Sequence, residues 1–216
     1  MADLIEMLPV KLNGKPYDEF DADIVAEVLV YLVGKSLIEV PRGELAGLRV
    51  DWGERLCHFY RSDDELLGLL VPYFQQGLEQ GERCMWLAST GSASPKARHS
   101  IASLADRQSS PEQLEVVDMD DWMPDLDTWP REEERALAQG YSGLRICGEA
   151  LELDGEMEAL RMKALSTYRA QRIARGDIAG IIRAHHAAFV KNGSCWQRVP
   201  TAGSTAAETI LAGLMD

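Results

Sequence analysis

The chain has 216 residues, 46% of them hydrophobic, and a formal net charge of −13. This length suits one substantial α/β domain with an accessory element, and the apolar content excludes an extended disordered chain. The acidic balance disfavours non-specific nucleic-acid binding, because neutralising phosphates needs a basic face. The most apolar run, residues 24–33, is too short to span a bilayer, which needs about 20 apolar residues.

Residues 1–50 are predicted to form an N-terminal accessory element. Asp21 or Asp23 can cap a helix that is expected to end near Val33. The broad apolar face of this helix must be buried, so packing on the main domain or dimerisation is the favoured interpretation. A degenerate helix-turn-helix is the alternative, although five basic against ten acidic residues in 1–51 argue against DNA contact.

From residue 55 onward the sequence predicts alternating strands and helices. Alternation at this spacing is typical of βαβ units and of a mostly parallel sheet covered on both faces. The first helix opens with Asp63 and Asp64, which are favourable at a helix N-terminus, and Gly77 and Gly81 are expected to close it. Strands are expected near 56–60, 83–89, 114–118, 143–148 and 163–168, and helices near 64–80, 95–106, 130–140 and 176–185.

The C-terminal segments depart from this pattern. Residues 187–191 and 195–199 are predicted to form an antiparallel hairpin, because Asn192-Gly193 suits a type I′ turn. The small and apolar residues that follow are expected to form a tail. The predicted organisation is therefore an accessory element, a sheet domain and a tail at residues 1–50, 51–200 and 201–216.

Several short segments follow one another through the predicted sheet domain: CHFY, DDEL, F-x-x-GL-x-x-GERC, GLRICGEA, ALSTY and RAHHAAFV. Their order over residues 53–199 resembles the sensory domain called MEDS, known from regulators of dichloromethane metabolism and from methanogen and other bacterial signalling proteins. The resemblance implies a RecA-like fold that lacks a working phosphate loop. It also implies sensing of a simple hydrocarbon derivative, with output to transcription. Arg55 stands where the family usually carries a histidine.

The segment ASTGSASPKARHS lies between a predicted strand and a predicted helix, which is the place of a phosphate loop. A working loop needs GxxxxGK followed by Ser or Thr. Here Pro95 replaces the second glycine and Ala97 replaces the hydroxyl residue, so Lys96 alone is not enough. A nucleotide-dependent hydrolase, with Asp118 as a magnesium ligand, and a cysteine-dependent hydrolase using Cys84 remain as alternatives.

A metal-binding sensor is a further alternative. The cysteines form no CxxC pair, and their spacing relative to the histidines matches no known zinc motif. No metal site is therefore predicted, and the cofactor is unknown. Free thiols and the lack of a signal peptide predict a cytoplasmic protein. The side chains considered as ligands are Cys57, His58, Cys84, Cys147, His185 and His186.

The favoured interpretation is a small organic ligand in an apolar pocket at the carboxyl ends of the strands. Cys57 and Cys84 are expected on neighbouring strands, and a Cys84–His185 pair is conceivable. Glu149 ends the apolar strand LRIC and needs a partner, for which Arg145, His185 or the ligand are candidates. Cys84 and Trp86 are equally compatible with a purely structural place in the core. The predicted ligand-binding residues are Cys57, Tyr60, Cys84, Trp86, Glu149 and His185.

The sequence therefore predicts a non-catalytic sensory protein. Its partners are expected to be the small organic ligand and either a second copy of the chain or a regulatory protein, whereas direct DNA binding is disfavoured and no membrane association is expected. A purely structural interaction module with a vestigial pocket is the remaining alternative.

Overall fold

The computed structural model of the protein describes most of the predicted sheet domain. Nearly all of the predicted accessory element and most of the tail, together with several loops, lie outside the described part, so their predictions stay as stated. In the described part no helix is long and apolar enough to cross a membrane. The described residues are 49–89, 94–105, 111–119, 127–151, 153, 158–192, 195–202 and 210.

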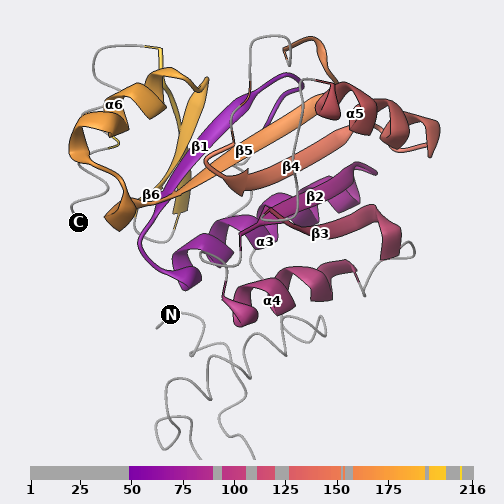
Figure 1. Ribbon diagram of the computed structural model, residues 1–216, viewed down its shortest axis with the longest axis horizontal. Coiled ribbons are helices and arrows are strands. Elements are labelled where there is room, and N and C mark those ends of the chain that lie inside the picture. The colour runs from indigo at the N-terminus through magenta and orange to yellow at the C-terminus, as the bar shows by residue number, and fades with distance from the viewer. Residues whose placement is uncertain are drawn as a thin grey trace, which may run out of the picture. The chain divides into compact units, whose positions relative to one another are not determined.

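A seven-stranded sheet organises these residues, with the strand order β3-β2-β4-β5-β1-β6-β7. All neighbouring strands are parallel except the last pair, which is antiparallel and forms the predicted hairpin. The predicted α/β class and mostly parallel sheet are therefore confirmed. The strands are β1 (Arg55–Tyr60), β2 (Arg83–Ala88), β3 (Leu114–Asp118), β4 (Leu144–Glu149), β5 (Met162–Arg169), β6 (Ala187–Asn192) and β7 (Cys195–Pro200) (Figure 1).

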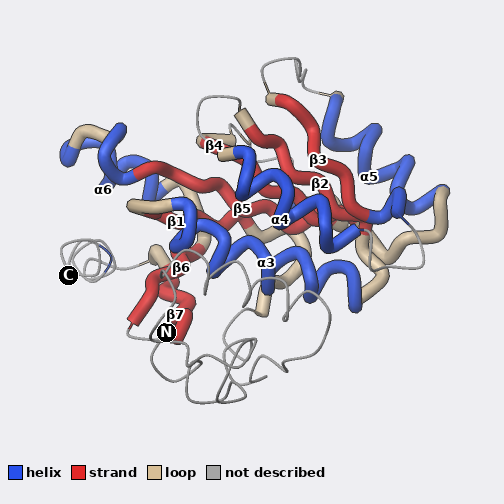
Figure 2. The backbone as a smooth tube through the Cα atoms, turned by 90° about the horizontal axis from the view of Figure 1, so that it is seen from below, coloured by secondary structure: helices blue, strands red, loops and turns tan. Residues whose placement is uncertain are grey.

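Helices cover both faces of this sheet (Figures 1 and 2). Two of them pack with the apolar cluster on one face, and the other two pack with the clusters on the opposite face. The helix predicted at 130–140 begins two residues earlier, because Pro130 is tolerated in a first helical turn. The first face carries α3 (Asp63–Glu79) and α4 (Pro95–Ala105), and the second carries α5 (Thr128–Ala138) and α6 (Arg175–Arg183).

Side chains of each strand alternate between the two helical layers. On β1, Leu56 and Tyr60 join the cluster that contains α3, whereas Cys57 and Phe59 join the cluster that contains α6. All four are buried. Burial on both faces explains why the strand sequences are almost continuously apolar rather than alternating.

Helix α3 begins and ends at residues suited to those positions. Ser62 caps it by accepting a hydrogen bond from the backbone N–H of Glu65 at 3.3 Å. It ends at Glu79, after which Gly81 adopts a φ of +70°, a left-handed conformation that favours glycine. The expectation that Gly77 also closes the helix is wrong, because Gly77 lies inside it and is buried.

Gly77 instead allows a close approach between α3 and the sheet. A Cβ atom at this position would lie 2.6 Å from Nε of Arg145 and 2.8 Å from Sγ of Cys84. Neither neighbour has room to withdraw, since both are fully buried. The sequence therefore needs a residue without a side chain here.

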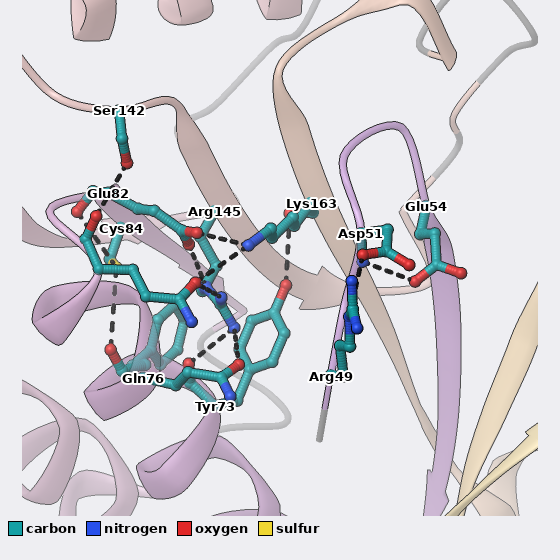
Figure 3. Close-up of polar contacts among 12 residues, drawn as sticks. Arg49, Asp51, Glu54, Tyr73, Gln76, Glu82, Cys84, Ser142, Arg145 and Lys163 are labelled. Carbon is teal, nitrogen blue, oxygen red and sulfur yellow. Dashed lines mark hydrogen bonds and ion pairs between the residues drawn. The ribbon is translucent and has the colours of Figure 1, made fainter. Parts of the chain in front are cut away.

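Three charged side chains meet beneath α3 at the amino ends of β2, β4 and β5 (Figure 3). Nε of Arg145 donates to one carboxylate oxygen of Glu82 at 2.5 Å, and Nζ of Lys163 donates to the other at 2.5 Å. Glu82 and Arg145 are fully buried, and Lys163 is nearly so. Such a cluster is tolerated inside a protein only when every charge is paired and hydrogen-bonded.

Oxygen atoms of α3 and of the residue after it complete this network. Nη1 of Arg145 donates to the carbonyl of Tyr73 at 3.0 Å and to Oε1 of Gln76 at 3.3 Å. Oε1 of Gln80 accepts from Nζ of Lys163 at 3.1 Å. The Tyr73 ring lies 4.6 Å from the Arg145 guanidinium carbon, and its hydroxyl donates to the carbonyl of Ile146. The network thus fixes the second half of α3 against β4 and β5.

Replacing Glu82 by Gln leaves two buried cations without a carboxylate. We expect Glu82→Gln to lower the free energy of unfolding by about 3–5 kcal/mol, measured by urea denaturation followed by circular dichroism. Arg49→Ala is the control, because its ion pair with Asp51 is exposed on both sides and contributes at most about 1 kcal/mol. Equal losses in the two variants would contradict the structural importance of the buried network.

Two glycines of α3 give a matched pair of alanine substitutions. Gly77→Ala is expected to destabilise the protein by about 1–3 kcal/mol, because the new methyl group overlaps Arg145 and Cys84. Gly68→Ala should instead be neutral or stabilising by up to about 1 kcal/mol, since its Cβ would make only an ordinary contact of 3.8 Å with Trp196. Thermal unfolding of both variants checks that the two substitutions change the stability in opposite directions.

Candidate functional site

The carboxyl ends of the parallel strands β1 to β5 lie along one edge of the sheet. Ligands of open α/β sheets bind at this edge. Charged and hydroxyl-bearing side chains gather there, from the strand ends and from the first turns of the helices that follow. These residues, called the strand-end group below, are Tyr60, Asp63, Ser89, Arg98, Asp118, Glu149, Arg169 and Arg172.

Glu149 connects the ends of two neighbouring strands. Its Oε2 accepts a hydrogen bond from Oγ of Ser89 at 3.0 Å, and its Oε1 lies 3.8 Å from Nη1 of Arg172. The carboxylate is partly exposed, with 22% of the side chain accessible. The expectation that Arg145 or His185 is the partner of Glu149 is wrong. Arg145 pairs with Glu82 at the other end of the strands, and His185 hydrogen-bonds to the carbonyl of Ile181 in α6.

The residue after Glu149 has an unusual backbone conformation. Ala150 has a φ of 49°, in the left-handed region, and its N–H donates to the carbonyl of Thr167 on β5 at 3.1 Å. This conformation costs a residue with a side chain about 1–2 kcal/mol. Such strain persists where the surrounding structure imposes it. The sharp turn fixes the end of β4 and with it the place from which the Glu149 carboxylate projects.

Tyr60 ends β1 and is covered by an arginine. The guanidinium carbon of Arg169 lies 5.3 Å from the centre of the Tyr60 ring, and Nη2 of Arg169 donates to Oδ1 of Asp63 at 2.9 Å. Burial raises the pKa of Tyr60; the hydrogen bond with Arg169 opposes this, and the nearby charge of Glu149 adds to it. Tyr60 is therefore a neutral phenol at physiological pH.

Each carboxylate of the strand-end group has an arginine within salt-bridge distance. Nη2 of Arg98 donates to Oδ2 of Asp118 at 3.4 Å and to the carbonyl of Ala88 at 2.8 Å, which ties α4 to the end of β2. The Asp63–Arg169 and Glu149–Arg172 pairs complete the set. The group is thus polar but close to charge balance.

The remaining predicted ligand residues do not join this group. Cys84 and Trp86 lie in the apolar cluster beneath α3 and α4, whereas Cys57 lies in the cluster beneath α6. His185 follows α6, where its Nδ1 donates to the carbonyl of Ile181 at 2.7 Å. Cys84 and His185 therefore belong to opposite faces of the sheet.

The expectation that Cys57 and Cys84 lie on neighbouring strands is wrong. Strand β1 pairs with β5 and β6, and strand β2 pairs with β3 and β4, so two strands separate the two cysteines. The connection through α3 crosses these strands, which sequence adjacency does not reveal.

Burial keeps the described thiols protonated. It raises the pKa of Cys57 to about 12, and it also raises the pKa values of Cys84 and Cys147. Because the thiolate is both the nucleophile and the metal ligand, these cysteines lack the usual environment of a reactive one. Within the described residues no group of three His, Cys, Asp or Glu side chains is placed to hold a metal ion.

His58 is a polar residue that the sequence interpretation did not select for the site. It is almost completely buried on the α3 side of β1, and its Nδ1 lies 3.1 Å from the carbonyl of Phe189 on β6. Since a carbonyl only accepts, Nδ1 carries the proton and Nε2 is an acceptor. Nε2 has no hydrogen-bond partner among the described residues. The alternation of Leu56, His58 and Tyr60 along one strand is the signal that places His58 beside Tyr60.

Comparison with known families assigns part of the chain. Residues 56–161 match the family model described as MEDS, the MEthanogen/methylotroph, DcmR Sensory domain. The match runs from β1 to the residue before β5, and so includes Tyr60, Ser89 and Glu149 of the strand-end group. No curated protein matches the chain.

The buried imidazole of His58 makes stability depend on pH. Burial lowers its pKa from 6.5 to about 4, although the Phe189 hydrogen bond and the charge of Glu65 act in the opposite direction. The unfolded chain therefore binds a proton at a higher pH than the folded protein, and stability falls as pH is lowered from 6.5 toward 4. This one group accounts for about 3 kcal/mol of that loss.

Urea denaturation at pH 7 and at pH 4 measures the effect. We expect His58→Asn, whose side-chain amide can still donate to the Phe189 carbonyl, to lose clearly less stability over this range than the parent protein. His185, whose pKa is also lowered by burial, remains in both proteins and cancels from the comparison. The same pH dependence in both proteins would contradict the assignment to His58.

Proposed function

Because residues 56–161 form a MEDS domain, we propose that the protein senses a small molecule and passes this signal to another component of the cell. The family match carries the proposal, since the family is described as a sensory domain. The proposed ligand is a simple hydrocarbon derivative or another small organic molecule. The proposal treats the protein as a cytoplasmic regulator of transcription rather than an enzyme.

The strand-end group is the proposed ligand site. It lies at the edge of the sheet that α/β proteins use for ligands, and within it Tyr60 and Glu149 come from the predicted set. The neutral phenol of Tyr60 and the partly exposed carboxylate of Glu149 offer hydrogen bonds to a small polar group. We place the ligand here rather than at Cys57, Cys84, Trp86 or His185, because these are divided between the two faces of the sheet.

We also propose that the fold is RecA-like without a working phosphate loop. Features of the connection between β1 and α3 support the lack of a phosphate loop at that place. Only Arg61 and Ser62 separate β1 from α3, and the first turn of α3 carries Asp63, Asp64 and Glu65. A helix N-terminus attracts phosphate through its N–H groups, but here Oγ of Ser62 already accepts from the N–H of Glu65, and the Glu65 carboxylate accepts from the N–H of Arg61. The use of these N–H groups within the protein favours the sensory function over nucleotide hydrolysis.

The proposed signal is a shift between two conformational populations. Ligand at the strand ends would stabilise one arrangement of the N-terminal element or of the 119–130 loop, and a partner protein or a second copy of the chain would recognise it. Hydrogen exchange of residues 20–40, with and without bound ligand, measures this shift. Unchanged protection at saturation would remove the mechanism while leaving ligand binding intact.

Native mass spectrometry of the purified protein tests ligand binding, with the denatured mass and metal analysis measured on the same sample. We expect a retained small organic molecule, or one found by a thermal-shift screen of small alcohols, aldehydes, amines and halogenated hydrocarbons. Glu149→Gln should weaken its binding about tenfold or more, because a charged hydrogen-bond acceptor is lost. Glu158→Gln is the control, since Glu158 is an exposed carboxylate paired with Arg55 outside the strand-end group. A protein that is empty and unresponsive to the screen contradicts the sensory proposal.

A further inference from the structure

A row of ring systems leads from the strand-end group into the interior of the sheet. The Arg169 guanidinium lies over the ring of Tyr60, and the Tyr60 ring stacks on His58 with their centres 6.4 Å apart. His58 in turn meets Trp196 edge to face at 5.0 Å. These contacts occupy the α3 side of β1 and continue to the hairpin strand β7.

In the three rings of this row the described polar atoms have partners, except for one nitrogen of His58. Nε1 of Trp196 donates to the carbonyl of Gly68 in α3 at 3.1 Å, and Tyr60 hydrogen-bonds with Arg169. Nδ1 of His58 donates to the Phe189 carbonyl. Nε2 of His58 is an acceptor for which the described residues provide no donor, although only 1% of the residue is exposed.

Two neighbouring side chains do not supply a donor for this acceptor. The Trp196 N–H is already used by Gly68, and the side chain of Phe189, opposite His58 on β6, is apolar. A buried acceptor that finds no donor costs about 1–3 kcal/mol. Native structures seldom keep such a group without a reason, and a ligand that supplies the donor is one.

We propose that Nε2 of His58 is the hydrogen-bond acceptor for the sensed molecule, which is a small, uncharged compound bearing an O–H or N–H donor, such as a short-chain alcohol. This inference rests on the proposed sensory function and places the inner end of its ligand site at His58. The apolar body of the compound packs against Tyr60 and Trp196.

The state of the imidazole fits this ligand class. Burial lowers the pKa of His58 to about 4, so the ring is neutral at physiological pH and Nε2 keeps its lone pair. The Phe189 carbonyl fixes the proton on Nδ1. A compound that only accepts hydrogen bonds, such as an ether, gains nothing at this atom. The site therefore selects for a donor rather than for size alone.

Two isomeric probes of equal atom count test the donor: 1-propanol, which has an O–H, and ethyl methyl ether, which has none. Binding of each is measured by titration of the full chain followed by two-dimensional NMR, together with long-range proton–nitrogen spectra of the imidazoles. We expect 1-propanol to bind about tenfold more tightly than the ether and to shift the Nε2 resonance of His58. The ether should leave that resonance in place.

Two variants make the test specific. His58→Asn keeps a donor for the Phe189 carbonyl but lacks an acceptor at the place of Nε2, so both probes should bind it with equal, weak affinity. Cys57→Ala, the adjacent residue on the opposite face of β1, should bind both probes as the parent protein does. If His58→Asn fails to fold, the Nε2 resonance of the parent protein decides the question alone.

The outcomes separate this inference from the function on which it rests. Equal affinity for the two probes, an unmoved Nε2 resonance, unaltered preference in His58→Asn, or no binding of either probe would each overturn the role of His58. If native mass spectrometry or the screen still identifies a ligand that Glu149→Gln weakens, the sensory function stands without it. If no ligand is found by any route, both are overturned.

Discussion

The shared carboxylate of Glu82 is the constraint on which the placement of the other elements depends. Arg145 and Lys163 reach it from adjacent strands, and the carbonyl and amide oxygens of α3 and Gln80 bind the donors that remain. Two cations for one carboxylate are stable in the interior only with these extra acceptors. Helix α3 is therefore part of the ionic network. Gly77 is the position at which its backbone comes close to Arg145.

Fixing α3 at the amino ends of the strands also fixes its opposite end at the strand-end group. The helix has 17 residues and so spans about 25 Å, enough to run the length of the strands beneath it. Its first residue, Asp63, holds Arg169 over Tyr60. A buried ion network at one edge of the sheet thereby sets the geometry of a candidate ligand site at the other, through a rigid element of known length.

The sequence was sufficient for local features and insufficient for long-range pairing. Caps, glycines and short apolar runs predicted the helices and strands within a few residues, because these signals act over a few positions along the chain. They did not reveal that β4 and β5 lie between β1 and β2, and so misjudged the neighbours of Cys57 and the partner of Glu149. The place of His58 depends on Phe189 and Trp196, more than a hundred residues away, and no local pattern encodes that contact.

The elements that meet at His58 suggest how ligand binding at this residue would affect the contacts among them. The imidazole belongs to β1, its proton is held by β6, and its neighbour Trp196 belongs to β7 and bonds to α3. The β6–β7 hairpin lies beyond the matched residues 56–161, so the inner end of the proposed site would be closed by a segment outside the matched region. A donor bound to Nε2 would stabilise the arrangement in which β1, the hairpin and α3 are all in contact, and would leave any arrangement that separates them unaffected. Differential stabilisation of this kind is what converts binding into a change of population.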